Sequence, residues 1–314
     1  MTRVINKIKK IPAVFWVIVV LAIVFSFFSK RYLTLRNLVV LLQQGAVLLV
    51  VASAATFVII SGGLDLSLGG ILTLAGVVVA LAVNAGVPAI LAILIDGIAG
   101  AVCGALNGVL ISYCGMQPFI TTLGTQGVMY GIALALTNKE GIHVSDESFI
   151  FFGDLIGYLP MAAISCLVIW LFAIFVQNHT KLGRYTFAIG GNKMGASLSG
   201  VDTHFWQWMI YVFAGFLTGL GAAILVARLE VADPIVGKQW EFEAIAASII
   251  GGTSMKIGKG DVKGTILGVA LFTMIRSGMN VVRVNSMWQP AILGSIIVFS
   301  IVLQVALVDR RNTK

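Results

Sequence analysis

The sequence predicts an all-α polytopic membrane protein. Of its 314 residues, 59% are hydrophobic and 11% are charged, and several apolar runs approach the roughly 20 residues that a helix needs to cross a bilayer. Glycine is abundant at 35 residues, and Gly97, Gly100, Gly104 and Gly108 form a small-residue stripe that suits close helix packing in a membrane. We therefore expect one transmembrane domain, residues 1–314, of about ten helices.

The candidate spans are separated by glycines, prolines and polar clusters that interrupt the apolar runs. They are Ala13–Phe28, Leu38–Ile60, Leu66–Val83, Pro88–Ser112, Pro118–Leu136, Pro160–Gln177, Phe205–Arg228, Phe242–Met255, Gly264–Val282 and Trp288–Leu307. The first span follows a basic segment, as the apolar part of a signal peptide would. Because Lys30 and Arg31 stand where small residues would mark a cleavage site, we expect this span to be retained.

The distribution of charge predicts the orientation of the bundle. Alternating the spans from a cytoplasmic N-terminus places the acidic segment Lys139–Asp154 outside and Lys181, Arg184 and Lys193 inside. This agrees with the enrichment of basic residues in cytoplasmic loops. Three basic residues after the first span disagree, because the scheme places them outside. We expect both termini in the cytoplasm.

Composition and motifs argue against several classes of function. The net charge of +8 lies in short segments between apolar runs, so membrane topology explains it better than binding to nucleic acid. Cys103, Cys114 and Cys166 have no metal-ligand spacing, and the three histidines lie far apart without acidic partners. The sequence also has no glycine-rich phosphate loop. We expect no enzyme activity, metal or cofactor in this chain, and any energy from ATP must come from a partner.

The stretch from Gly190 to Gly200 is one of the few segments that face water. Gly190 and Gly191 allow the backbone to turn, Asn192 is a favoured N-cap residue, and Gly200 stands where a helix prefers a left-handed residue. The pattern predicts a two-turn helix, which is marginal alone because helix nucleation is costly. Either the helix leans on another protein, or the stretch is an ordinary loop between spans.

Asp65 is one of two acidic residues in the first 139 residues, and glycines flank it on both sides at Gly62, Gly63 and Gly69. An acid within an apolar segment is expensive to desolvate and is a candidate for function. The glycines would let the helix unwind and expose backbone groups to a ligand or to a neighbouring helix. Alternatively, Asp65 and Ser67 merely cap the next helix at the membrane edge. The local pattern leaves both interpretations open.

A second glycine-interrupted segment resembles the first. Gly251, Gly252 and Thr253 end the short apolar run that begins at Phe242, much as a glycine pair ends an earlier run. Two such segments in the two halves of the chain hint at an internal repeat with broken helices at a transport path. Glycines that serve only helix packing would produce a similar pattern.

Four motifs in series carry a resemblance to a known family. They are Gly62–Gly69, Pro118–Thr125, Gly183-Arg184 with Ala188–Asn192 and Leu198–Val201, and Glu241–Thr253. Over nearly its whole length the chain resembles the permease subunits of bacterial sugar importers driven by ATP-binding cassette (ABC) ATPases, of the ribose, galactose and xylose type. Each motif alone is weak because it consists of glycine and aliphatic residues, but the four in this order are specific.

The resemblance implies a multi-pass permease of the bacterial inner membrane. It dimerises, with an identical or a different second permease subunit, around a central path. Such a permease receives a monosaccharide from an extracytoplasmic binding protein. It contacts a separate ABC ATPase, which holds ATP and Mg²⁺, through a cytoplasmic coupling loop at about residues 178–204. A secondary transporter or channel for small polar solutes would use the Asp65 segment equally well and is the alternative.

The candidate site residues fall into three groups. Those of the path or gate are Gly62, Gly63, Asp65, Ser67 and Gly69. Those of the coupling loop are Arg184, Gly190, Gly191, Asn192, Ala196, Leu198, Ser199 and Gly200. Those expected in the path or in packing are Glu241, Gly251, Gly252, Thr253, Asp96 and Arg276.

Several residues depart from the family pattern. Lys193 and Gly195 stand where an acid or proline and an alanine are usual, and Asp96 and Arg276 stand within spans where small or amide side chains are expected. A charge within lipid costs about 2.5–3.5 kcal/mol on insertion scales, so Asp96 and Arg276 are expected to face protein, water or an opposite charge. They lie at similar depth, and either they pair with each other or each is satisfied separately.

Overall fold

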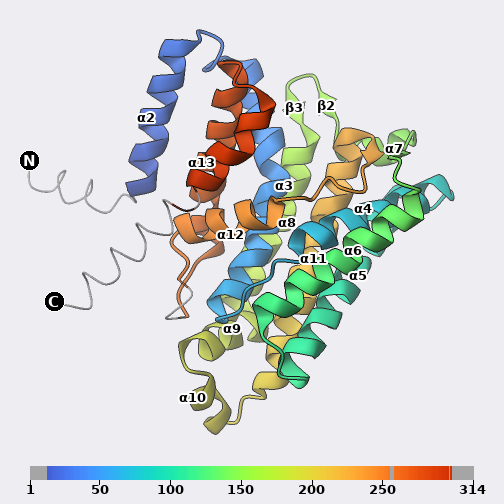
Figure 1. Ribbon diagram of the computed structural model, residues 1–314, viewed down its shortest axis with the longest axis vertical. Helices are drawn as coiled ribbons and strands as arrows, with labels where there is room; N and C mark the ends of the chain where they lie inside the picture. The colour runs from blue at the N-terminus through green and yellow to red at the C-terminus, as the bar shows by residue number, and fades with distance from the viewer. Residues whose placement is uncertain (1–12, 255–257, 297, 299–314) are drawn as a thin grey trace, which may run out of the picture.

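The computed structural model describes residues 13–254, 258–296 and 298, and it is a bundle of helices (Figure 1). The long helices are α2 (Ala13–Phe28), α3 (Leu35–Ile60), α4 (Leu68–Asn84), α5 (Ala89–Gly108, continued by the π-helix Val109–Tyr113), α6 (Pro118–Thr137), α8 (Met161–His179), α11 (Thr203–Leu229) and α13 (Val262–Val281). The shorter ones are α7 (Glu147–Ile150), α9 (Lys181–Gly191), α10 (Lys193–Leu198), α12 (Trp240–Ile250) and a 3₁₀ turn at Ser286–Trp288.

Two pairs of very short antiparallel strands join connections at one end of the bundle. β1 (Ile142–His143) pairs with β4 (Val231–Ala232), and β2 (Leu155–Ile156) pairs with β3 (Leu159–Pro160). Figure 1 shows α7 and the β2–β3 hairpin at this end, and α9 and α10 at the opposite end. The two ends therefore carry different kinds of connection.

Helix α3 forms the centre of the bundle. Every residue from Ala46 to Ile60 is buried, and α3 packs against α8, α11, α12 and α13. A helix that is apolar all round must be covered by other helices, which explains this position.

The expected glycine stripe packs α5 against α11. A Cβ at Gly100 would overlap the carbonyl of Gly215, and one at Gly104 would overlap the carbonyl of Tyr211. From the other side, Gly219 lies on the carbonyl of Asp96. These glycines allow two backbones to touch, as small residues do between membrane helices.

The expected spans correspond closely to α2, α3, α4, α5, α6, α8, α11 and α13. Among the described residues, six helices are long and apolar enough to cross a membrane, and α4 and most of α2 are shorter apolar helices. The expectation for Phe242–Met255 was wrong. Helix α12 has 11 residues and is about 16 Å long, roughly half of the hydrocarbon thickness, and it lies across the middle of the bundle (Figure 1).

Part of the predicted topology falls on residues that the structure does not describe. Residues 289–296 are helical, but half of the expected last span, 288–307, lies outside the described residues. The basic segment before Ala13, Met255 and the basic C-terminal tail also lie outside them.

Candidate functional site

The connection between α3 and α4 is irregular backbone that is largely buried. Helix α3 ends in a Schellman turn, in which the N–H of Gly62 donates to the carbonyl of Ile59 and the N–H of Gly63 donates to that of Val58. Gly62 has a φ of +82°, which a side chain at this position would strain. A Cβ at Gly63 would come within 2.6 Å of the Tyr211 hydroxyl, so both glycines are required by local geometry.

Asp65 lies within this irregular segment and is 1% exposed. Its Oδ1 accepts hydrogen bonds from the backbone N–H (2.9 Å) and the hydroxyl (2.6 Å) of Ser67, the residue that precedes α4. The Ser67 hydroxyl in turn accepts from Asn107 Nδ2 (2.7 Å), and Asn107 Oδ1 accepts from the Thr125 hydroxyl (2.6 Å). Asp65 thus forms a side-chain turn with Ser67 just before α4, but the Ser67 side chain makes no capping hydrogen bond to the helix. The same hydrogen-bond chain connects the segment to α5 and α6.

One side of this hydrogen-bond chain is unsatisfied. Asp65 Oδ2 and the buried Tyr211 hydroxyl make no hydrogen bond with any described residue. A buried carboxylate oxygen without a partner is costly, and such groups in an otherwise satisfied network often have a functional reason. Asp65 thus combines a structural turn with Ser67 and a free acceptor, between the end of α3 and the start of α4.

The second interrupted helix repeats the turn of the first. Helix α12 ends at Ile250, after which the N–H of Gly252 donates to Ile249 and that of Thr253 donates to Ser248, in the same Schellman pattern. Gly252 has a φ of +101°. Gly252 is therefore a turn residue. At the other end of α12, the preceding residue Gln239 is also left-handed, with a φ of 73°.

Helix α12 is held by small and hydroxyl side chains. The Thr56 hydroxyl on α3 lies 2.9 Å from the hydroxyls of both Ser248 on α12 and Thr265 on α13. Gly251 packs on the carbonyl of Gly264, which makes it a packing residue. Thr253 is fully buried and its side chain lies against Gly260.

The start of α4 and the segment leading into α12 meet at Gly69. A Cβ at Gly69 would overlap Glu241 Oε2 and the carbonyl of Gly237, and would lie 3.0 Å from the Tyr130 hydroxyl. The Thr73 hydroxyl donates to the Gly69 carbonyl (3.0 Å) and accepts from the Gly237 N–H (3.0 Å). Gly69 is therefore required because the two segments touch through their backbones.

Glu241 places a buried carboxylate at this meeting point. The residue is 4% exposed, and neither its Oε2 nor the nearby Tyr130 hydroxyl makes a hydrogen bond of standard geometry with a described residue. The polar side chains that they face are Gln126 for Glu241 and Thr73 for Tyr130. The two oxygens come from different helices, α12 and α6. They are free to accept or donate hydrogen bonds to a polar solute if the segments separate.

The two charges that depart from the family pattern do not pair with each other. Arg276 on α13 forms an ion pair with Glu243 on α12, a partner that the sequence did not suggest. Asp96 is fully buried on α5, and neither carboxylate oxygen makes a hydrogen bond of standard geometry with a described residue. The polar group that it faces is the backbone of Ala223 on α11. Pairing of Asp96 with Arg276 was therefore wrong, and Arg276 is instead neutralised by Glu243.

The predicted helix after Asn192 is present as α10. Asn192 Oδ1 accepts from the Gly195 N–H (2.8 Å), Gly200 has a φ of +83°, and the N–H of Val201 donates to Ala196 in a further Schellman turn. These findings confirm the N-cap and the C-terminal glycine. Ser199 is the C-cap residue, and its hydroxyl donates back to the Gly195 carbonyl (2.9 Å).

The role expected for Gly190 and Gly191 was wrong. They do not form a turn but end helix α9, which begins at Lys181. Gly190 is needed because a Cβ would overlap the carbonyl of Ile60, whereas nothing lies within 4 Å of a Cβ at Gly191. The sequence pattern could not separate a flexible glycine from one that permits close packing.

Helix α10 presents apolar side chains to solvent. Leu198 is 83% exposed and Met194 is 72% exposed, whereas Ala196 is buried at 8%. Lys193 donates to the Gln207 side chain on α11 (2.7 Å), which gives this unusual lysine a structural role. A groove of about 410 Å³ lies between α9 and α10, lined by Arg184, Tyr185, Ala188, Asn192, Gly195, Ala196, Ser199 and Val201.

Helix α9 touches the ends of both interrupted segments. Gly190 lies on the Ile60 carbonyl at the end of α3, and the backbone of Gly258, after α12, lies on Gly190 and Gly191. Gly260 packs against the side chains of Ile60 and Thr253. We call this contact of α9, Ile60 and residues 258–260 the glycine junction.

Several residues of the site were missed at the sequence level. Asn107, Thr125 and Tyr130 contribute polar groups from within apolar helices, and Glu243 neutralises Arg276. An amide or carboxylate inside an apolar run is the signal that could have identified Asn107 and Glu243. Tyr130 carries no such signal, because tyrosine is common in apolar packing.

A membrane bundle in which two interrupted helices meet at buried carboxylates, with a short amphipathic element at one end, defines a transport protein. The chain belongs to the family described as "Branched-chain amino acid transport system / permease component", which matches residues 37–301. It is a multi-pass permease subunit of an ABC importer, in which the ATPase is a separate subunit.

Curated relatives match almost the whole chain. The chain is 37% identical to the ribose import permease protein RbsC of Bacillus subtilis, over 90% of this chain and 89% of the relative. It is 34% identical to the D-allose transport system permease protein AlsC of Escherichia coli, over 92% and 90%. It is also 34% identical to the galactose/methyl galactoside import permease protein MglC of Salmonella typhimurium, over 92% of both chains. No solved structure matches the chain.

Proposed function

We propose that the chain imports a monosaccharide into the cytoplasm as one of two permease subunits of an ABC importer. The single observation that carries the coupling is the glycine junction, because the α9–α10 element rests directly on the ends of α3 and of the segment after α12. In this proposal the exposed Leu198 and Met194 contact the ATPase. Movement of α9 then shifts both interrupted segments together.

The orientation follows from the charges at the two ends. Lys181, Arg184 and Lys193 lie at the end that carries α9 and α10, and Asp146, Glu147 and Asp154 lie in connections at the other end. Positive residues are retained on the cytoplasmic side. We therefore place the α9–α10 end and both termini in the cytoplasm, and the binding protein at the opposite end.

The meeting point of Gly69 and Glu241 is proposed as the gate of the path. Its contacts are between backbones and are tight, so the described arrangement is closed there. The free oxygens of Asp65, Glu241 and Tyr130 would pass a hydroxylated solute by transient hydrogen bonds once the segments separate. Few side chains converge on one point, which suits a permease that must release what it admits.

The relatives favour a sugar over an amino acid as the substrate. The family description names branched-chain amino acids, but the relatives matched over about nine tenths of this chain are named for ribose, allose and galactose. Relatives that share a third of their residues along the whole length constrain the substrate more closely than a broad family does.

The experiment is reconstitution of the permease in liposomes with an ATPase and a secreted binding protein encoded beside it. ATP-dependent uptake of labelled ribose, allose or galactose, and none of leucine, is the expected result. Leucine uptake would overturn the substrate assignment. Sugar uptake that needs neither ATP nor the ATPase would instead identify a secondary transporter or channel.

A further inference from the structure

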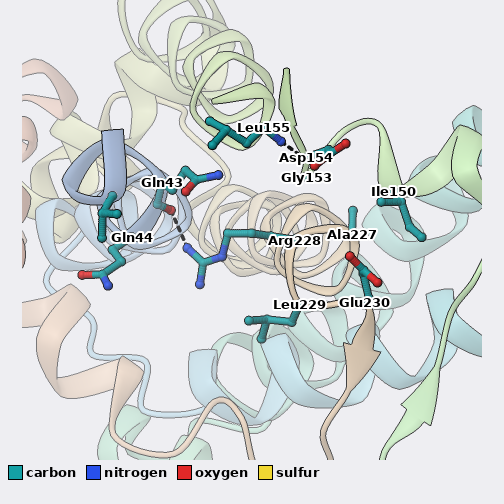
Figure 2. Close-up of a pocket in the computed structure, with 11 residues that line it drawn as sticks. Gln43, Gln44, Ile150, Gly153, Asp154, Leu155, Ala227, Arg228, Leu229 and Glu230 are labelled. Atoms are coloured by element: carbon teal, nitrogen blue, oxygen red, sulfur yellow. Dashed lines mark hydrogen bonds between the residues drawn. The ribbon is translucent and has the colours of Figure 1, made fainter. Parts of the chain in front are cut away.

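A cavity lined by both polar and apolar groups lies at the end of the bundle opposite α9 and α10, away from the glycine turn that ends α3. It has a volume of about 340 Å³ and is lined by residues of α3, of the end of α11 and of the connection at residues 150–155 (Figure 2). The volume is at the lower end of the roughly 300–1,000 Å³ range of small-molecule sites. The cavity is therefore large enough for a small solute and too small for a protein segment.

Arg228 supplies hydrogen-bond donors to this cavity. Its half-buried side chain reaches from α11 toward α3, where the guanidinium donates to the Gln43 carbonyl (Figure 2). A guanidinium has five N–H donors, and this is its only hydrogen bond among the described residues. The side-chain amide of Gln43 makes none, and Gln44 Oε1 is buried without a partner.

Asp154 and Glu230 supply acceptors at the same cavity. Asp154 Oδ1 accepts from the Leu155 N–H (2.6 Å), which leaves the other oxygen for a ligand. Two carboxylates and one guanidinium give the lining a formal charge of −1, so an anion is disfavoured. Figure 2 shows Arg228 and Gln43 on one side of the end of α11 and Glu230 on the other, so a neutral solute whose groups both donate and accept would be held mainly by the guanidinium and the amide.

Apolar side chains separate these polar groups. Ile150, Leu155 and Leu229 line the cavity and can cover the C–H faces of a sugar ring. The combination of amide, guanidinium and carboxylate groups with aliphatic surface is that of a site for a polyhydroxylated ring. It does not favour a hydrocarbon chain, which would leave the buried polar atoms unpaired.

We propose that this cavity is an outer binding site for a neutral monosaccharide on the permease itself. It rests on the proposed function and adds a site that the sugar occupies before it reaches the gate. The site is open to solvent, and the sugar that it binds is the same one that the binding protein delivers. Its affinity should be weak, so that it concentrates released sugar at the outer end without retaining it.

The test measures protection of an introduced thiol in the full-length permease, purified in nanodiscs without the binding protein. Leu155→Cys places the thiol in the lining, and Tyr158→Cys places it on the β2–β3 turn outside the lining, where the side chain is 68% exposed. Both are made with Cys114→Ser, because Cys114 is exposed. Ribose, allose or galactose at millimolar concentration should slow modification of Leu155→Cys by a membrane-impermeant thiol reagent several-fold, and leave Tyr158→Cys unchanged.

Loss of the polar groups should remove the protection. Gln43→Ala changes only a side chain that no other described residue binds, so it should fold normally; Arg228→Met removes the donors and also a contact to α3. Equal protection at both thiols, no protection at either, or full protection in Gln43→Ala would overturn the site. Stronger protection by a hexuronic acid would do the same and indicate an anion site. Protection by the sugar-free binding protein alone would indicate a docking surface.

The same variants in the reconstituted importer separate the two proposals. ATP-dependent sugar uptake without thiol protection refutes the outer site and leaves the proposed function standing. Thiol protection without ATP-dependent sugar uptake supports the site and refutes the importer assignment.

Discussion

Replacing Gly190 by alanine tests the glycine junction directly. The new Cβ would overlap the Ile60 carbonyl and lie 3.0 Å from the Cα of Gly258. Both contacts are to backbone atoms, so no side-chain rotation can relieve them. Helix α9 must then move away from the end of α3, which separates the ATPase-facing element from the first interrupted segment.

Gly191→Ala is the matched control. It lies in the same last turn of α9, and nothing is within 4 Å of its new methyl group. Both substitutions gain up to about 1 kcal/mol of helix propensity, and only Gly190→Ala pays the cost of overpacking, about 1–3 kcal/mol. The gain in helix propensity is the same in both variants, so their free energies of unfolding should differ by about 1–3 kcal/mol, with Gly190→Ala the less stable.

The assay compares ATP hydrolysis and sugar uptake in liposomes, with permease abundance and thermal unfolding measured in parallel. If the junction carries coupling, Gly190→Ala should reduce the uptake per ATP by about 5-fold or more, the factor that corresponds to 1 kcal/mol. Gly191→Ala should behave as the unsubstituted chain. Equal uptake per ATP in the two variants, with both folded, would refute the reasoning.

Three further predictions use residues outside the junction. Leu198→Glu should abolish copurification of the ATPase and leave permease abundance unchanged, because the Leu198 side chain is 83% exposed. Ala196→Glu should lower permease abundance, because Ala196 is buried. ATPase binding by the Leu198→Glu variant would exclude this contact. Asp65→Asn keeps an oxygen that can accept from the Ser67 N–H, and should slow uptake without changing the affinity of the binding protein for sugar; unchanged uptake would leave Asp65 with only its turn before α4. Glu243→Gln or Arg276→Gln should lower permease abundance more than the double substitution does, because each leaves one charge of the pair without its partner. Breaking a fully buried pair costs about 3–5 kcal/mol, and the cost of breaking this pair should be smaller, since 31% of the Arg276 side chain is exposed. Additive losses in the double variant would contradict a coupled pair.

Local capping chemistry was readable from the sequence because it depends on neighbours within a few residues. Asn192 caps α10 and Gly200 is left-handed, as the pattern predicted. The similarity between the glycine turns after α3 and α12 was also visible, and both turns have the same hydrogen-bond pattern. That the two halves of the chain are a repeat remains a prediction.

Partners distant in the sequence could not be predicted in the same way. Similar depth made Asp96 a candidate partner for Arg276, but depth along a span says nothing about which helices adjoin. The structure places Arg276 beside Glu243 and places Asp96 against α11. The same limit hid Asn107 and Tyr130, because their positions near Asp65 and Glu241 depend on how α5 and α6 pack.

The sequence by itself determined the class of protein, most of the helices and the caps of α10. Apolar length, charge distribution and cap residues act locally or through the solvent, so they do not depend on which helices are neighbours. The tertiary structure alone decided that α12 is half a span, that Gly190 rests on Ile60, and that Glu241 meets Gly69. These features arise where backbones approach closely, and a glycine in the sequence permits such an approach without naming the partner.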